Sequence, residues 1–250
     1  MNDIERQRYS RQIFLPQIGE AGQQRLVDAR VMVVGLGGLG SPVAMYLAAA
    51  GVGTLVLVDF DRVELSNLQR QIIHGEADVG RLKVESAAAT IAGLNRDTGV
   101  ETIPRALDDE ELVETTRGCQ VVVDASDNFE TRYALNRACV STGVPLVSGA
   151  ATAWDGQVAV FDPRRDGSPC YHCLYPDDGG PGETCDQAGI FAPLLGMVGS
   201  TQAAEVLKLI IGTGETLAGR LMLLDALGMS IRILGIPRDP GCPVCGTQPH

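Results

Sequence analysis

The fold prediction starts from the stretch Val31-Met-Val-Val-Gly-Leu-Gly-Gly-Leu-Gly-Ser-Pro-Val-Ala-Met-Tyr-Leu-Ala-Ala-Ala-Gly51 and its continuation, Leu55-Val-Leu-Val-Asp59. Residues 31–34 form a β-branched run that is typical of a buried parallel strand. The small residues after the glycines allow a helix to lie close on a sheet, and residues 55–58 repeat the strand pattern. The stretch therefore predicts a β-α-β unit.

The first strand is followed by closely spaced glycines. Gly35, Gly37 and Gly40 give the spacing G-x-G-x-x-G, and Gly38 is a fourth glycine within it. Glycine allows a tight turn and lets a phosphate approach the backbone where a Cβ would stand in the way. Pro42 suits the first turn of a helix, because its missing N–H costs nothing there. The motif predicts a nucleotide phosphate at the N-terminus of that helix.

The second strand of the unit ends at Asp59. This carboxylate lies about 20 residues beyond the glycines, where an acidic side chain can hold the hydroxyls of a ribose. A helix cap or a surface turn is the alternative role for such a residue. The motif does not distinguish NAD, FAD and ATP, so the nucleotide must be chosen from the rest of the chain.

Composition limits the possible partners. The chain has 250 residues, of which 45% are hydrophobic, and its formal net charge is −11. This length predicts a single large domain, residues 1–250, with a nucleotide-binding half at about residues 1–150 and a second half at about 151–250. The negative charge argues against binding to nucleic acid or to anionic membranes. A bound phosphate would need a few local basic residues to oppose the overall field.

Neither a membrane span nor a signal peptide is predicted. Residues 31–58 carry no charge before Asp59, but their glycines and Pro42 fall where a strand-turn-helix-strand unit needs them. Residues 1–6 lack a basic start followed by an apolar run. We therefore expect a cytoplasmic protein whose seven cysteines are thiols or metal ligands.

Strand and helix patterns alternate through the first half of the chain. The sequence predicts short helices within residues 4–29, later helices at 83–94, 108–115, 130–142 and 196–211, and later strands at 101–103, 121–125, 146–148, 156–161, 220–225 and 230–236. The predicted fold is an α/β, Rossmann-like mixed sheet with a parallel N-terminal half, an antiparallel C-terminal half and helices on both faces.

Two segments outside these elements also carry predictions. Ser66 and Gln69 are spaced as a capping box that opens a short helix, which would place Asn67 and Arg70 one turn apart. Residues 171–188 contain little apolar content and several Pro and Gly, so a mobile surface loop is expected there.

Two Cys-x-x-Cys pairs form the second strong signal. Cys170 with Cys173, and Cys242 with Cys245, supply the four thiolates that close a tetrahedral zinc shell. Such a zinc has no open position, so it is predicted to be structural and to tie the C-terminal tail to the middle of the chain. The alternatives are a redox dithiol or an accidental spacing, and His172 is expected to be a bystander.

The choice of nucleotide depends on the charged residues. None of the three histidines stands out as a catalytic acid, which argues against a dehydrogenase. Arg70 and Lys83, with Asp127, are expected near the crevice at the carboxyl ends of the strands. Two cations and a carboxylate able to hold Mg²⁺ are suited to a triphosphate. The alternative for each is an ordinary solvated charge or, for Asp127, a helix cap.

Several motifs occur together in one order and carry a resemblance. They are Arg8-Tyr-Ser-Arg-Gln12, Gly35-Leu-Gly-Gly-Leu-Gly-Ser41, Asp59-Phe-Asp-Arg-Val-Glu-Leu-Ser-Asn-Leu-Gln-Arg-Gln71, Gly80-Arg-Leu-Lys83, Asp124-Ala-Ser-Asp-Asn128 and the two cysteine pairs. Over nearly its whole length the chain resembles the MoeB/ThiF family of ubiquitin-activating-type adenylyltransferases. The resemblance implies a homodimer that uses ATP and Mg²⁺ to adenylate the C-terminal glycine of a ubiquitin-like sulfur-carrier protein.

The resemblance also implies roles for particular residues. Gly38 and the neighbouring loop amides would face the phosphates, Asp59 would hold the ribose, and Arg11 would reach into the partner subunit's site. The other residues implied at the nucleotide are Asp61, Ser66, Asn67, Arg70 and Lys83 in the triphosphate segment, Asp127 beside Mg²⁺, and Asn128 in the nucleotide pocket.

The remaining cysteines and the single tryptophan allow more than one interpretation. Cys185 matches a cysteine that binds the carrier covalently in the thiamine branch of the family, but a loop cysteine without an activating base is equally an incidental residue. Cys119 and Cys139 have apolar neighbours and are predicted to be small core residues. Trp154 is expected in the core or at a dimer contact.

Two segments favour the molybdopterin-synthase branch: His74-Gly-Glu-Ala-Asp-Val-Gly-Arg-Leu-Lys-Val-Glu-Ser-Ala87 and Pro145-Leu-Val-Ser-Gly-Ala-Ala151. The same reaction on the thiamine-pathway carrier is the alternative, and a non-catalytic nucleotide-binding module that docks the carrier is an alternative of another class. An NAD-dependent dehydrogenase ranks third. Because no sulfurtransferase domain is recognised after the second cysteine pair, a separate sulfurtransferase is the expected sulfur donor.

Overall fold

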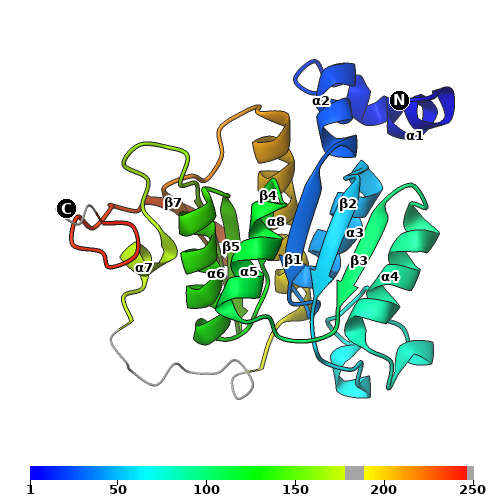
Figure 1. Cartoon of the computed structure of the whole chain (residues 1–250). Coiled ribbons are helices and arrows are strands. Elements are labelled where there is room, and N and C mark those ends of the chain that lie inside the picture. Colours follow the sequence, from blue (N-terminus) through cyan, green and yellow to red (C-terminus); the bar gives the residue numbers. More distant parts are fainter. Residues whose placement is uncertain (178–188, 247–250) are drawn as a thin grey trace.

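The computed structural model describes residues 1–177 and 189–246, whose strands form one eight-stranded sheet in the order β3-β2-β1-β4-β5-β6-β7-β8 (Figure 1). The strands are β1 Arg30–Val34, β2 Thr54–Val58, β3 Gly99–Ile103, β4 Val121–Asp124, β5 Leu146–Thr152, β6 Asp155–Phe161, β7 Arg220–Asp225 and β8 Ser230–Gly235. In this order, neighbouring strands from β3 through β2, β1 and β4 to β5 pair in parallel, and neighbouring strands from β5 through β6 and β7 to β8 pair antiparallel. The predicted change from parallel to antiparallel pairing is confirmed.

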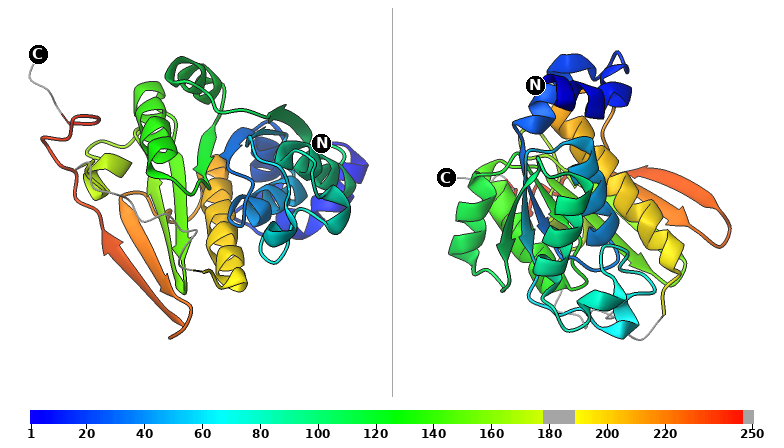
Figure 2. Two further views of the ribbon diagram at one scale, coloured as in Figure 1. Left: turned by 90° about the horizontal axis from the view of Figure 1, so that it is seen from below. Right: turned by 90° about the vertical axis from the view of Figure 1, so that its right-hand side faces the viewer.

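Helices cover both faces of the sheet (Figure 2). They are α1 Asp3–Ile13, α2 Gly19–Val27, α3 Gly40–Ala50, α4 Lys83–Leu94, α5 Asp109–Arg117, α6 Phe129–Thr142, α7 Tyr171–Leu174 and α8 Ala192–Ile211, with 3-10 turns η1 Leu65–Asn67 and η2 Glu76–Asp78. Helices α3, α4 and α8 share one apolar core, and α5 and α6 share the other. The β7–β8 hairpin projects beyond these helices in both views of Figure 2.

The two cores follow from the alternation of side chains along the central strands. In β1, Val31 and Val33 belong to the core beneath α3 and α8, whereas Met32 and Val34 belong to the core beneath α5 and α6. Successive residues of a strand point to opposite faces, so a strand that is covered on both sides is apolar throughout. This explains why the decisive run shows no polar alternation.

The glycine-rich loop needs glycine at two of its positions. Gly35 has φ +90°, and a Cβ there would lie 2.6 Å from the backbone oxygen of Ala125. A Cβ on Gly40 would lie 1.9 Å from the backbone oxygen of Gly35. Only a residue without a Cβ allows these close approaches. The loop after β1 is therefore pressed against the loop that joins β4 to α6.

The directions of the strands define two edges of the parallel half. Helices α1 and α2 precede β1 and lie at the upper edge in Figure 1, so the carboxyl ends of β1, β2 and β4 lie at the lower edge. The glycine-rich loop, Asp59 and Asp127 all directly follow strands at this lower edge. Ligands of open parallel sheets bind at this edge.

Three details of the secondary structure differ from the sequence predictions. Helix α8 begins at Ala192, four residues before the predicted start at residue 196, because Pro193 is accommodated in its first turn. Residues 171–174 form α7, with a buried Tyr171, where a loop was predicted. Strand β5 continues to Thr152, since it pairs with β6 along its full length.

Two local predictions are also corrected. Glu64, not Ser66, caps the 3-10 turn η1, and its partner is Asn67. Trp154 lies outside the core, because it is 39% exposed and stacks on Phe191 with 4.3 Å between ring centroids, so only the predicted alternative of a dimer contact stays open. The predicted helix ends at residues 142 and 211 are confirmed, and a glycine in the left-handed conformation caps each helix, Gly143 after α6 and Gly212 after α8.

Helix α8 is, among the described helices, the one long and apolar enough to cross a membrane. Half of its apolar window is buried within the fold, where it packs against α3 and the sheet. The prediction that residues 31–58 form a strand, a helix and a second strand is confirmed.

Candidate active site

The glycine-rich loop is held from outside by Asp59. The backbone N–H of Leu36 donates to Asp59 Oδ2 over 2.7 Å, and the N–H of Asp61 donates to Asp59 Oδ1 over 2.8 Å. One carboxylate therefore joins the end of β2 to the loop that follows β1. Because a carboxylate oxygen has two acceptor sites, these bonds leave Asp59 able to accept further donors.

Lys83 is a buried cation at the first residue of α4. Its side chain is 7% exposed, and Nζ lies 2.8 Å from Asp61 Oδ2. Burying a charge is costly unless a partner compensates for it. Asp61 is 52% exposed and supplies that partner from the segment after β2. The alternative of an ordinary solvated lysine does not fit this burial.

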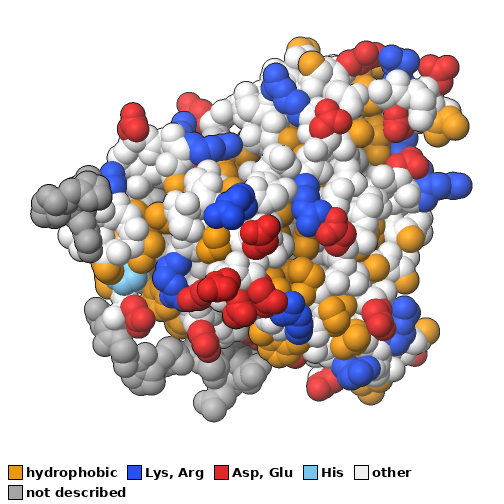
Figure 3. All heavy atoms as spheres, viewed as in Figure 1, with side chains coloured by type: hydrophobic (Ala, Val, Ile, Leu, Met, Phe, Trp, Pro, Cys, Tyr) orange, Lys and Arg blue, Asp and Glu red, His pale blue; other side chains and the backbone are white. Residues whose placement is uncertain are grey.

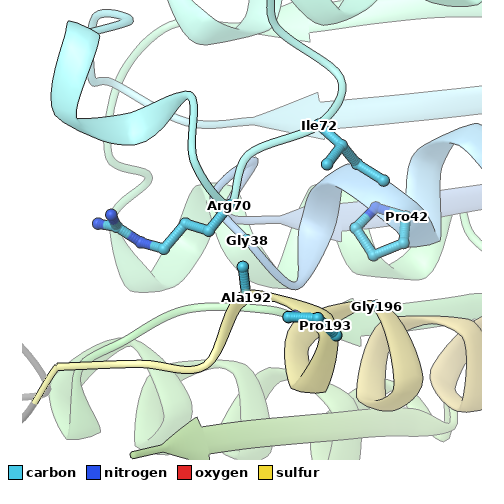
Figure 4. Close-up of a pocket in the computed structure, with 7 residues that line it drawn as sticks. All are labelled: Gly38, Pro42, Arg70, Ile72, Ala192, Pro193 and Gly196. Carbon is cyan, nitrogen blue, oxygen red and sulfur yellow. The ribbon is translucent and has the colours of Figure 1, made fainter.

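Arg70 borders a cavity at the glycine-rich loop (Figure 4). The cavity has a volume of about 250 Å³ and is lined by Gly38, Pro42, Arg70, Ile72, Ala192, Pro193 and Gly196. Arg70 Nη1 donates to the backbone oxygen of Ser66 over 3.0 Å. Figure 4 shows the guanidinium extending away from the Pro42 and Gly196 side of the cavity. Arg70 is half-buried.

Asp127 lines a second cavity, of about 290 Å³, with residues of α6 and of the antiparallel strands. Asn128, not Asp127, caps α6, because its Oδ1 accepts from the N–H of Thr131 over 2.9 Å. The Asp127 carboxylate is exposed and accepts a bond of 3.3 Å from Asn128 Nδ2. The two cavities divide the predicted residues: Gly38 and Arg70 border one, and Asp127 borders the other.

Acidic side chains gather at one part of this edge. Figure 3 shows acidic side chains gathered at the lower end of α5 and α6, with basic side chains interspersed above them. The first turn of α5 alone carries Asp109, Glu110 and Glu111. An incoming polyanion therefore depends on the few local cations of the site and on the N–H groups of the loop.

Arg11 lies away from the other predicted site residues of its own chain. It belongs to the last turn of α1, at the upper edge in Figure 1. Tyr9 of the same helix packs against Gly51, and its hydroxyl accepts from Asn95 Nδ2 over 2.8 Å. Gly51 and Asn95 end α3 and α4, which both start at the lower edge. Within one chain, α1 and the glycine-rich loop thus occupy opposite edges of the sheet.

Asp124 is a site residue to which the sequence analysis assigned no role. It is fully buried at the end of β4, where Oδ1 accepts from Ser126 Oγ over 2.6 Å and Oδ2 accepts from Ser148 Oγ over 2.7 Å. Arg132 Nε lies 3.8 Å from the same carboxylate. These contacts hold the loop that carries Asp127. An aspartate within an otherwise apolar strand was the available signal.

His74 is the second such residue, since its loop position alone suggested no role. Its side chain is buried, with Nδ1 2.8 Å from Ser86 Oγ and Nε2 3.1 Å from the backbone oxygen of Leu36. Burial lowers the pKa of His74 below 6.5, and the nearby Lys83 charge lowers it further, against smaller opposing effects of neighbouring acceptors. The imidazole is therefore neutral at pH 7.

The four paired cysteines meet in one cluster, as predicted. The Sγ atoms of Cys170, Cys173, Cys242 and Cys245 all lie within 4.8 Å of one another. Two contacts join the pairs across the chain: Cys170 to Cys242 at 3.6 Å and Cys173 to Cys245 at 3.4 Å. Four thiols at this spacing match the donor set of a closed zinc site. His172 lies beside the cluster, with Nδ1 3.8 Å from Cys242 Sγ.

The thiols of this cluster differ in acidity. Burial raises the pKa of Cys170 to about 11. Burial opposes ionisation of Cys242 as well, but backbone N–H groups at Cys245 and Val244 hydrogen-bond its sulfur and bring its pKa down to about 7. One thiolate thus forms readily near neutral pH, and a bound cation would favour the remaining deprotonations.

The other cysteines divide between confirmed and undescribed residues. Cys119 and Cys139 are buried core residues, as predicted, and burial raises the pKa of each thiol. The proposed covalent role of Cys185 lies outside the described residues.

Comparisons with known proteins agree along nearly the whole chain. The ThiF family matches residues 9–244. The chain is 51% identical to a sulfur carrier protein adenylyltransferase of Thermus thermophilus, over 97% of this chain and 91% of that protein. It is 45% identical to the molybdopterin-synthase adenylyltransferase of Escherichia coli, over 98% of each chain. It is 44% identical to the sulfur carrier protein ThiS adenylyltransferase of that organism, over 98% of this chain and 97% of the other.

A solved structure extends the agreement to three dimensions. The crystal structure of E. coli MccB with ATP superposes with a TM-score of 0.83 at 26% sequence identity. The match covers 98% of this chain and 75% of the other.

Proposed function

The chain belongs to the ThiF family, and from this premise we propose that it transfers AMP from ATP to the C-terminal carboxylate of a ubiquitin-like sulfur-carrier protein. The relatives named above as adenylyltransferases cover this chain almost completely, which supports an enzyme of that class. The product is a mixed acyl-phosphate anhydride, which a sulfur nucleophile can then attack.

The observation that carries the proposal is the buried cation Lys83, which pairs with Asp61 in the segment whose Asp59 also binds the glycine-rich loop. A C-terminal carboxylate is ionised at neutral pH, so its attack on the α-phosphorus needs no general base. One of its oxygens bonds to phosphorus while the bond from that phosphorus to the bridging oxygen breaks, and pyrophosphate leaves. The difficulty is to bring two anions together, and local cations and N–H donors lower that barrier.

In this proposal, different site residues contact different parts of the nucleotide. Gly38 and the loop amides face the phosphates, and Asp59 accepts from the ribose. Arg70 and Lys83 stabilise the charge that develops on the phosphoryl oxygens and on pyrophosphate. The remaining contacts come from Gly35, Gly37, Gly40, Asp61, Ser66, Asn67 and Asn128.

Asp127 is the residue that we assign to Mg²⁺. Carboxylate and phosphate oxygens are the ligands that this ion prefers. Asp124 is buried and already accepts from two serines, whereas the Asp127 carboxylate is exposed and faces a cavity. When bound, the ion would neutralise charge on the phosphates.

The cavity beside Asp127 suits the extended tail of the carrier. It runs from Asp127, before α6, and Phe129, the first residue of α6, to Gln157 on β6 and Arg232 on β8, so it joins the nucleotide edge to the antiparallel half. A polypeptide lying there would bring its terminal carboxylate toward the phosphates. This supports the assignment of residues 151–250 as the carrier-binding and zinc-binding half.

A homodimer completes the proposed site. Arg11 lies at the upper edge of its own sheet, so the role implied for it needs a second chain whose α1 approaches the lower edge. In this arrangement the partner subunit supplies a third cation to the triphosphate. The sulfur itself is donated by a separate sulfurtransferase.

For the carrier we favour the molybdopterin-synthase branch on the two segments named in the sequence analysis, with the thiamine branch as the alternative. Identities of 45% and 44% to one named relative of each branch favour neither. The choice therefore depends on which carrier tail the protein accepts.

The proposal is tested by incubating the protein with ATP, Mg²⁺ and each candidate carrier in turn. We expect the intact mass of one carrier to rise by one AMP, with release of pyrophosphate. A carrier that ends one residue before the terminal glycine is the matched control and should gain nothing. If ATP binds but no carrier gains AMP, the protein is a nucleotide-binding docking module instead.

A further inference from the structure

His74 links two parts of the structure that are far apart in the chain. Its Nε2 contacts the backbone oxygen of Leu36 in the glycine-rich loop, and its Nδ1 contacts Ser86 Oγ on α4. The N–H of Leu36 is meanwhile held by Asp59. Both polar groups of this one loop residue are therefore fixed from outside the loop.

The helix end of this link is also the part of the structure that carries Lys83. Ser86 follows Lys83 by three residues in α4, so the two side chains lie on the same face of the helix, about one turn apart. Lys83 also makes two hydrogen bonds to Asp61. Its Nζ donates to the Asp61 carboxylate, and its backbone N–H donates over 2.9 Å to the Asp61 backbone oxygen. His74 thus connects the element that carries the buried cation to the loop whose amides face the phosphates.

We propose that His74 is a positioning residue for AMP transfer. It holds the glycine-rich loop at a fixed distance from Lys83, so that the loop amides and the Lys83 ammonium group can contact the same triphosphate. The inference rests on the proposed function and adds to it a residue that touches neither ATP nor the carrier. Its effect is expected on the rate of transfer and on nucleotide binding, because small displacements of catalytic groups are costly.

The link requires one form of the imidazole. A backbone oxygen only accepts, so Nε2 carries the proton and donates to Leu36, while Nδ1 accepts from the Ser86 hydroxyl. The charged groups that act on the ring are Lys83 from α4, Asp78 from η2 and Asp59 from the end of β2. Burial, the largest effect, lowers the pKa of His74 and keeps the ring neutral.

The test compares four variants with the wild-type protein. His74→Phe keeps a ring of similar size without the link, and His74→Gln supplies an Nε2 donor that can reach Leu36. Ser86→Ala removes the bond at the helix end. Thr90→Val is the matched control, because Thr90 Oγ1 donates over 2.7 Å to the backbone oxygen of Ile73, next to His74, and not to the glycine-rich loop.

We expect His74→Phe to lower kcat roughly 10- to 100-fold and to weaken binding of a non-hydrolysable ATP analogue, with the KM for the carrier unchanged. His74→Gln should recover most of the loss, Ser86→Ala should show a smaller one, and Thr90→Val should transfer AMP at the wild-type rate. Nitrogen-15 spectra of the free protein at pH 7 should show the proton on Nε2.

Three results would overturn the inference. They are full activity of His74→Phe beside an active wild type, an equal loss in Thr90→Val, or a proton on Nδ1. If His74→Phe fails to fold, an unchanged kcat in both His74→Gln and Ser86→Ala, with a proton on Nδ1, overturns it. If the wild type itself adenylates no carrier, the proposed function fails. The inference about His74 is then tested by binding alone, and an unchanged affinity of His74→Phe for the ATP analogue overturns it.

Discussion

Lys83→Met should slow AMP transfer about 10²- to 10³-fold, the loss expected when one preorganised group that stabilises developing charge is removed. Methionine keeps most of the apolar stem in its buried position while removing the charge. The fold should tolerate the change, because the Asp61 carboxylate left without its partner is 52% exposed and can be hydrated. The measurement is the rate of AMP–carrier formation under single-turnover conditions, by intact mass.

The chain's other lysine gives a matched control. Lys208 also pairs with an acidic side chain, Glu205, but it lies near the C-terminal end of α8, away from the nucleotide edge. Lys208→Met should therefore keep the wild-type transfer rate within about two-fold, whatever it does to stability. Wild-type turnover in Lys83→Met, or an equal loss in both variants, would remove Lys83 from the proposed mechanism.

Cys242→Ala should abolish metal binding and lower the melting temperature by roughly 10 to 20 °C. A structural zinc site contributes several kcal/mol or more to folding, and about 1 kcal/mol shifts the melting temperature of a chain of this size by about 2–4 °C. Cys242 is buried and joins the tail to Cys170, 72 residues earlier. Loss of the site therefore releases a long-range connection as well as the tail.

Cys139→Ala is the control for this change, since Cys139 is a cysteine of equal burial in the core between α6 and the sheet. We expect it to retain one zinc per chain and to cost only about 1 kcal/mol. The measurements are metal content by elemental mass spectrometry and the thermal transition. Equal melting temperatures for the two variants, or no metal in the wild-type protein, would rule out a structural zinc site.

Much of the fold was predictable because it is encoded locally. The apolar run before Gly35, the glycine spacing and the alternating strand and helix patterns each lie within one short segment, and the structure confirms them. The cysteine cluster is a long-range feature, yet it was predictable from residue type, because thiols in Cys-x-x-Cys pairs share one chemistry. The places of Asp59 and Asp127 after parallel strands were also predictable, and their roles at a nucleotide stay a proposal.

What the sequence did not reveal depends on contacts between distant segments. The hydrogen bond between His74 and Leu36 joins residues 38 positions apart, and the local sequence around neither residue predicts it. The burial of Lys83 follows from the packing of α4, not from its neighbours in sequence. Ser66 is the better N-cap by residue type, but the backbone of η1 places Glu64 at that position.

The most direct measurement of the central claim is a crystal structure of the protein with a non-hydrolysable ATP analogue and Mg²⁺. We expect the triphosphate to lie on the amides around Gly38, within contact of Lys83 and of a reoriented Arg70, with the ribose at Asp59. A nucleotide bound elsewhere, or phosphates that neither cation contacts, would contradict the claim that these cations bring two anions together.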